Sequence, residues 1–377
     1  MTSFLRFLSP AMLGLGLLSA ATPSAFAAGF GPISDFMTMD VCVGADGRPV
    51  AGIPGDGACK RHRDIKPGEA PSYTLQNFAS PRANCPNGPI AKVNVPVIKD
   101  GNTRIVSSTI RQPACGKPGP TGGGDDDGNQ NGASIQWFDQ GYGFIMGSYS
   151  PVALSTFESD RCLTNSNSSQ RFFRGWVIGP AEVPALGASG YGIFPSKLKT
   201  GKAATLMGGC ADRYNRALTT WSVNDVTFKS NRKLVSIVAD HYAQGAPDGQ
   251  TPGDAKQVER TYWTREFGLS RWEKWAREDW VHPRAKKTAP ELAQALFAAG
   301  RCSAPMSQPV AFNKSMQVIP SQTTDGAYSK VILNPATGEQ HTWYMTLCED
   351  YTNAAESPDA SRYSGMLAGL ADDTYWK

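Results

Sequence analysis

Carboxylic acids and aromatic rings gather in the second half of the chain and are the side chains best suited to chemistry. The segment 258–280 alone holds four of the nine tryptophans, together with arginines and glutamates. Cleavage of a glycosidic bond needs two carboxyl groups, one protonated and one ionised. We therefore predict Asp240 and Glu266 as catalytic residues, with His241, beside Asp240 at the end of a predicted strand, as a candidate base.

Several side chains near these acids could hold a sugar, because tryptophan rings stack on the apolar faces of pyranoses. The candidate substrate-binding residues are Trp221, Trp263, Trp272, Arg265 and Arg271. The structural alternative is that the tryptophans pack in the core against arginines. Glu266 would then form a simple ion pair with Arg265 at a turn, and Asp240 with His241 would be ordinary paired strand residues.

A glycine- and aspartate-rich segment, 116–134, contains the first half of a calcium-binding loop. Asp127, Asn129 and Asn131 alternate and are followed by glycine, which matches the calcium template. Phe138 stands at the twelfth position, where the template requires a bidentate glutamate. The segment is therefore either a calcium loop or a flexible acidic linker, and no other cofactor is predicted.

Several enzyme classes leave no signature in this sequence. It has no G-x-S-x-G elbow, no H-E-x-x-H motif, no Walker loop and no G-x-G-x-x-G before a helix. Its histidines do not lie within ligand spacing of one another, which argues against a zinc hydrolase; they are His62, His241, His282 and His341. A serine triad remains open, because its members need not be adjacent in sequence.

The first 27 residues are typical of a secretory signal peptide. Arg6 precedes an apolar run over 11–21, and Ala25 to Ala27 form an A-x-A site, so we expect cleavage after Ala27. The alternative is an uncleaved anchor, but the run is shorter than the ~20 residues that span a bilayer. The sequence therefore predicts a secreted or periplasmic protein without a membrane span after cleavage.

All eight cysteines lie beyond the predicted cleavage site, and an even number in an exported chain favours four disulfides. Eight cysteines allow about a hundred pairings, so the connectivity does not follow from the sequence. Nearest-neighbour closure gives Cys42–Cys59, Cys85–Cys115, Cys162–Cys210 and Cys302–Cys348. A metal cluster is the alternative, but no short C-x-x-C spacing supports it.

The formal net charge of +4 is too small, over this length, for a nucleic-acid-binding surface. One local basic cluster, Lys60 to Arg63, is interpreted as a solvated face, with a site for phosphate or an acidic ligand as the alternative. The predicted partner is a polysaccharide or other glycan, and nucleic acid is not predicted.

The many glycines and prolines favour short elements joined by turns. Strands are predicted at 90–98, 103–110, 135–149, 171–178, 218–228, 233–242, 328–333 and 342–348. The segment 258–275 is predicted as a hairpin that turns near 266–268, although a helical spacing from Trp272 onward is an alternative. A single helix is expected at 290–301. This order predicts a mainly β protein, either a jelly-roll-like antiparallel sandwich or a barrel.

The predicted organisation follows these features along the chain. It comprises a signal peptide at 1–27, a loop-rich disulfide-pinned region at 28–115, a linker or long loop at 116–134, a main β domain at 135–352 and a polar tail at 353–377. We expect an exported polysaccharide-active hydrolase or lyase with two carboxyls within about 10 Å of each other. The alternative is a non-catalytic glycan- or surface-binding protein of a bacterial envelope.

Overall fold

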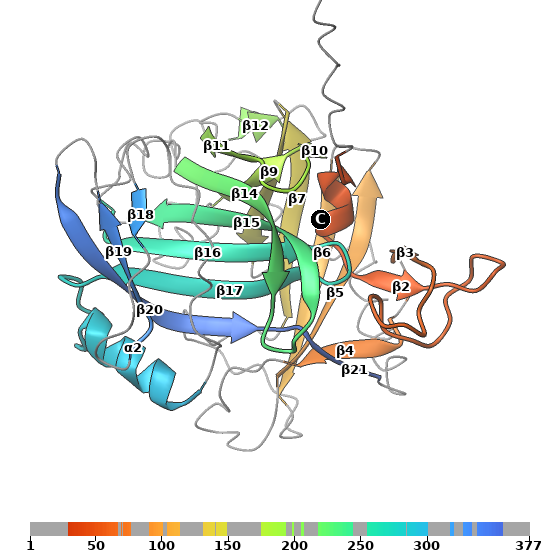
Figure 1. Cartoon of the computed structure of the whole chain (residues 1–377). Coiled ribbons are helices and arrows are strands. Elements are labelled where there is room, and N and C mark those ends of the chain that lie inside the picture. The colour runs from red at the N-terminus through yellow and green to blue at the C-terminus, as the bar shows by residue number, and fades with distance from the viewer. Residues whose placement is uncertain are drawn as a thin grey trace, which may run out of the picture.

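The computed structural model describes residues 29–66, 69, 71–76, 90–100, 104–113, 131–139, 141–148, 175–193, 198–199, 205–206, 218–243, 255–283, 285–300, 317–319, 327–333 and 338–356. Within these ranges the chain is mainly β and antiparallel, as predicted (Figure 1). The predicted signal peptide, Asp127 and Asn129 of the calcium loop, and Cys85, Cys115, Cys162, Cys210 and Cys302 lie outside the described residues.

The larger sheet has eight strands and curls into a half-barrel (Figure 1). In spatial order it contains β11 (Ser189–Ile193), β14 (Leu218–Thr227), β15 (Lys233–Ala243), β16 (Gln257–Thr264), β17 (Gly268–Arg277), β20 (Gln340–Asp350), β19 (Ser329–Leu333) and β18 (Gln317–Ile319). Each pair is antiparallel, and tight turns join β14 to β15 and β16 to β17. Asn231 and Gly268 adopt positive φ at these turns, a conformation that both residue types tolerate. The predicted hairpin is confirmed, and Trp272 and Trp275 lie on a strand.

The smaller sheet has seven strands. In spatial order it contains β21 (Asn353–Glu356), β4 (Tyr73–Gln76), β5 (Ile90–Asp100), β6 (Arg104–Pro113), β7 (Asn131–Asp139), β8 (Tyr142–Ser148) and β9 (Gly175–Pro180). The predicted linker 116–134 falls between β6 and β7, which are hydrogen-bonded neighbours, and β7 begins at Asn131 within it. The sheet thus takes strands from both sides of that segment. The two-layer sandwich form is not confirmed.

Short paired segments complete the N-terminal part. Two of these pairs are β1 (Gly31–Pro32) with β10 (Glu182–Val183) and β2 (Asp40–Cys42) with β3 (His62–Asp64). The 3-10 helix η1 (Ile33–Phe36) lies between β1 and β2 in the chain. Farther along, β12 (Leu198–Lys199) pairs with β13 (Thr205–Leu206). The predicted Cys42–Cys59 disulfide is confirmed, and it pins the loop between β2 and β3. Cys348, on β20, is also disulfide-bonded.

Both faces of the curled sheet bury apolar side chains. One face packs against η1 and β9 through a cluster that includes Ile33, Phe36, Met37, Ile178, Val223, Ile237 and Trp263. The opposite face carries a second cluster, which includes Tyr242, Val258, Trp275, Trp343 and Met345. Packing in the first cluster is tight at Gly190, where an added Cβ would lie 2.5 Å from the Trp221 ring. The curled sheet is therefore a buried layer rather than a solvated one.

The predicted helix forms as α2 (Ala289–Ala298) and covers the second cluster next to β20 (Figure 1). Thr288 and Glu291 make a reciprocal capping box, Pro290 occupies the first turn and Gly300 follows the end with positive φ. No helix among the described residues is long and apolar enough to span a bilayer.

Replacement of Thr288 by alanine is expected to lower the free energy of unfolding by about 1 kcal/mol, because the hydroxyl accepts the Glu291 backbone N–H. Urea denaturation followed by circular dichroism measures the change. Thr288→Ser keeps the cap and serves as the control. An alanine variant as stable as the wild type would show that the cap contributes nothing.

Candidate functional site

Asp240 and Glu266, the predicted carboxyl pair, do not come together in the fold. Asp240 lies opposite Arg260 in the pairing of β15 with β16, and Ser236 lies opposite Thr264. Arg260 and Thr264 are therefore four strand positions apart, about 13 Å, and Glu266 lies beyond Thr264 in the hairpin turn. The two acids belong to different environments.

Asp240 is the acceptor in a buried two-point ion pair. Its side chain accepts hydrogen bonds from Arg260 Nε at 2.7 Å and Nη2 at 3.1 Å, and the residue is 2% exposed. Burial raises the pKa of Asp240, and the charge of Arg260 opposes that rise. The predicted base His241 points to the opposite face, because neighbouring strand residues alternate. Asp240 and His241 therefore do not form one acid–base unit.

Further charged residues extend this pair into a buried charge network. We use that name for Asp240, Arg260, Arg271, Glu273, Lys330 and Asp350, all buried. Arg271 Nη2 lies 2.7 Å from Glu273 Oε1, and its Nη1 lies 3.6 Å from Asp350 Oδ2. Tyr262 and Trp275 each donate a hydrogen bond to Glu273. Three basic side chains thus accompany three acidic ones, and pairing of opposite charges is what a buried set of charged groups requires.

Lys330 is the buried amine of the network. Its Nζ lies 4.4 Å from the centre of the Trp275 ring and has no hydrogen-bond partner among the described residues. Burial lowers the pKa of this amine to about 7, and the charge of Arg260 lowers it further. The predicted substrate-binding residue Arg271 is fully buried beside it in the same network.

The predicted sugar platforms lie mostly in the core. Trp221 and Trp263 are buried in the cluster that packs against η1, so other side chains cover their ring faces. Trp272 is partly exposed; it donates a hydrogen bond to Glu259 and carries Lys274 Nζ at 4.8 Å from its ring. Arg265 is half exposed and pairs with Asp35 at 3.1 Å.

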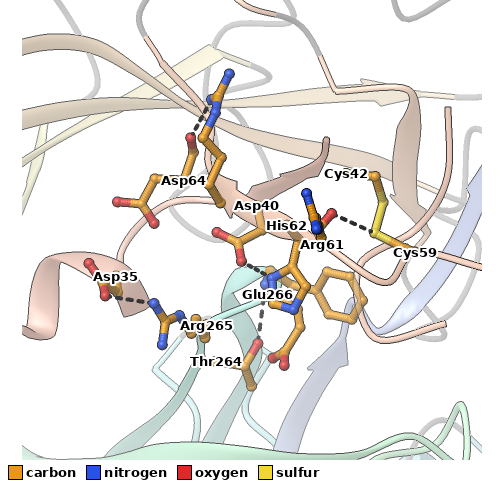
Figure 2. A network of polar contacts seen from close by, with 12 residues as sticks. Asp35, Asp40, Cys42, Cys59, Arg61, His62, Asp64, Thr264, Arg265 and Glu266 are labelled. Carbon is orange, nitrogen blue, oxygen red and sulfur yellow. Dashed lines mark hydrogen bonds and ion pairs between the residues drawn. A yellow bond between two sulfur atoms is a disulfide. The ribbon is translucent and has the colours of Figure 1, made fainter. Parts of the chain in front are cut away.

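Glu266 meets two residues from the N-terminal region, Asp40 and His62 (Figure 2). Strand β2 docks along the hairpin turn, where the Asp40 backbone N–H donates to the Glu266 carbonyl at 3.0 Å. Tyr73 fixes the same junction, because its hydroxyl lies 2.8 Å from the Asp40 carbonyl and 3.2 Å from that of Glu266. Register places Cys42 opposite His62, and the disulfide joins Cys42 to Cys59, which precedes His62 by three residues.

The surroundings of this Asp40–His62–Glu266 cluster raise the pKa of two of its members, His62 and Glu266. His62 Nδ1 hydrogen-bonds to Asp40 Oδ2, and that bond is the main cause that raises the pKa of His62. Burial raises the pKa of the Glu266 carboxyl, and the negative charge of Asp40 raises it further. Asp40 Oδ1 and Glu266 Oε2 are buried without a hydrogen-bond partner among the described residues. A carboxyl with a raised pKa thus lies beside an imidazole oriented by a carboxylate.

Glu266 is among the site residues that the sequence predicts, whereas Asp40 and His62 are not. His62 stands in the basic run Lys60 to Arg63, for which the sequence favours a solvated face. The signal that could have found both residues is the predicted Cys42–Cys59 disulfide, because Asp40 and His62 flank its two cysteines. Within the described ranges, no three His, Cys, Asp or Glu side chains are arranged to hold a metal ion.

Comparisons with family models, with curated proteins and with solved structures found no match. Function is therefore inferred from the geometry of the Asp40–His62–Glu266 cluster.

Proposed function

We propose that this protein is exported and cleaves extracellular or periplasmic polysaccharide by acid–base catalysis at the Asp40–His62–Glu266 cluster. The supporting observation is the position of the Glu266 carboxyl beside an imidazole that Asp40 orients. Glu266 acts as the general acid, because burial raises its pKa and favours the protonated form. His62 acts as the base, and Asp40 fixes the tautomer and orientation of its ring.

Polysaccharide fits this chemistry better than a small substrate for two reasons. A glycosidic oxygen is a poor leaving group, so its departure needs a proton from an acid such as Glu266. The His62 side chain is 29% exposed at the end of the hairpin, where a polymer can approach it from outside. The predicted export of the chain would bring the site to such polymers.

A second candidate function, glycan binding without cleavage, is supported by a different observation. Tyr191 lies on the edge strand β11 of the curled sheet and is 58% exposed. Its backbone carbonyl accepts a hydrogen bond from the Tyr142 hydroxyl, which holds the strand in place. An exposed aromatic ring on a rigid edge can stack on a sugar without any catalytic group nearby.

A polysaccharide panel tests the two functions together. The purified mature protein is incubated with acidic and neutral polymers, and both retention on the polymer and release of reducing ends are measured. If the protein is the proposed enzyme, reducing ends should be released by the wild type and by Glu182→Gln, an exposed control. Glu266→Gln should abolish this release. Retention without release supports glycan binding instead. If neither occurs with any polymer, both functions are wrong.

A further inference from the structure

Part of the loop between β2 and β3 lies against the Glu266 side chain. We call residues 51–59 of this loop the cover segment. Gly55, in its middle, approaches Glu266 so closely that an added Cβ would lie 3.7 Å from Glu266 Cγ. Gly55 adopts positive φ, which glycine tolerates best, and Pro54 before it is buried. Glu266 remains partly exposed. The cover segment therefore shields one side of this acid from water and leaves another side accessible.

Two non-covalent attachments hold the cover segment to the rest of the chain. Asp56 forms an ion pair with Arg232 from the turn between β14 and β15, and the Arg232 guanidinium lies 5.6 Å from the centre of the Phe267 ring. The backbone N–H of Gly52 donates to Ser72 Oγ at 3.2 Å, and that hydroxyl donates to the Gly52 carbonyl at 3.0 Å. The Asp56 side chain is 41% exposed, so water can replace its partner and the ion pair adds little.

The disulfide Cys42–Cys59 is the covalent attachment of the cover segment. Two backbone hydrogen bonds, from Asp56 to the Ile53 carbonyl and from Cys59 to the Asp56 carbonyl, fold the segment into turns that end at Cys59. The segment also packs on the bond itself, because an added Cβ at Gly52 would lie 3.0 Å from Cys42 Sγ. A cross-link over a separation of 17 residues strongly limits the freedom of the detached segment. The disulfide is therefore the strongest of the three attachments.

The contact between Asp40 and His62 has supports of its own. Strands β2 and β3 pair through their backbones, and the Val43 N–H donates to the Arg61 carbonyl at 2.9 Å. The hydroxyl of Tyr73 holds β2 to the hairpin turn at Glu266. Loss of the disulfide would therefore release the cover segment from Glu266 while β2 and β3 stay paired.

Resting on the proposed function, we infer that the Cys42–Cys59 disulfide is a redox switch that closes the cover segment over Glu266. In the reduced chain, only hydrogen bonds and a half-exposed ion pair hold the segment, so it opens and water reaches Glu266. Oxidation passes two electrons and two protons from the two thiols to a disulfide-bearing oxidant, which becomes a dithiol, and the S–S bond forms. The site is then complete only in an oxidising compartment, which the predicted export supplies.

Carbodiimide labelling of carboxyl groups, followed by peptide mass spectrometry, tests the switch without any substrate. Cys42→Ser combined with Cys59→Ser is expected to raise the labelling rate of Glu266 by about tenfold or more, because the open form is more populated. The exposed Glu182 should react at the same rate in both proteins. The buried Glu273 should stay unlabelled, which reports that the core is folded. Equal labelling rates of Glu266 would overturn the switch.

Asp56→Asn is the matched control, because it removes the ion pair with Arg232 and keeps the disulfide. The labelling rate of Glu266 should then change by less than about twofold. A rate as high as in the double serine variant would show that the ion pair holds the segment, and would overturn the switch. If the double variant also labels Glu273, wild-type protein treated with a mild dithiol replaces it, with the reduced cysteines mapped by alkylation. The same rise at Glu266 is expected there, and its absence overturns the switch.

Polysaccharide cleavage is measured separately on the same proteins. The double serine variant is expected to have a kcat at least about tenfold lower, because opening the segment removes part of the burial that raises the pKa of Glu266. The pKa of His62, followed by NMR, should be unchanged because Asp40 still holds its ring. Fast labelling of Glu266 with an unchanged kcat would overturn the regulation. Absence of cleavage by every protein, wild type included, would overturn the proposed function, whereas the labelling rates still decide whether the segment opens.

Discussion

Asp240→Asn is expected to lower the free energy of unfolding by about 3–5 kcal/mol. The substitution keeps the size and shape of the side chain but removes the charge that compensates Arg260. Because the side chains of Asp240 and Arg260 are both buried, water cannot replace the lost carboxylate as a partner of Arg260. The cost is therefore that of leaving an arginine buried without its carboxylate, and it exceeds the net value of the pair itself.

Two comparisons isolate this effect in urea denaturation. Asp225→Asn breaks a surface pair, Lys233–Asp225 at 2.9 Å, and should cost under about 1 kcal/mol. The double replacement Asp240→Leu with Arg260→Met removes both charges and should recover much of the loss. An Asp240→Asn variant that is as stable as Asp225→Asn would show that loss of the Asp240 charge does not destabilise the folded state.

Glu266→Gln is expected to lower kcat on a cleaved polysaccharide by about 10²–10⁴-fold, the usual contribution of one general acid. Glutamine preserves the shape of the site but has no proton to donate at the glycosidic oxygen. The folded state should tolerate the change, because Glu266 Oε2 has no hydrogen-bond partner among the described residues to lose. If this variant has the same kcat as the wild type, Glu266 is not the general acid.

The pH profile gives a second readout of the same pair. The active form needs a neutral His62 and a protonated Glu266, so activity should be bell-shaped with limbs set by the two coupled groups. Asp40 raises the pKa of both groups, through its hydrogen bond to His62 and its charge near Glu266. Asp40→Asn should therefore move both limbs to lower pH. A purely structural role for Asp40 would lower activity without moving the limbs.

The sequence predicts the local elements well because each depends on neighbours in the chain. Alternating β-branched and aromatic residues predicted β14 to β17, and Pro290 with Gly300 marked the ends of α2. The separation of Asp240 from Glu266 has a different origin. It depends on the register of β15 against β16, which places Arg260 opposite Asp240 and which no local pattern reports.

The sequence does not predict which residues make up the candidate site, for a related reason. Glu266 is recognisable as an acid near a turn, but Asp40 and His62 reach it only because β2 docks on that turn, some two hundred positions away along the chain. Trp221 and Trp263 show the converse case. Their residue type suits both sugar stacking and core packing, and only the contacts with η1 and β9 distinguish the two.

Pairing of β4 with β21 has a consequence for the order in which this molecule assembles. Gln76 meets Asn353 across roughly 280 intervening positions, whereas the Cys42–Cys59 disulfide closes a separation of 17. Closing the longer loop costs roughly 2.5 kcal/mol more in chain entropy, and long-range pairing of this kind slows folding. We therefore expect the disulfide-pinned loop to close early and the smaller sheet to be completed last. Until β21 pairs with it, the edge of β4 is open and can form hydrogen bonds with a strand of another chain. A high concentration of partly folded molecules therefore favours aggregation over correct folding.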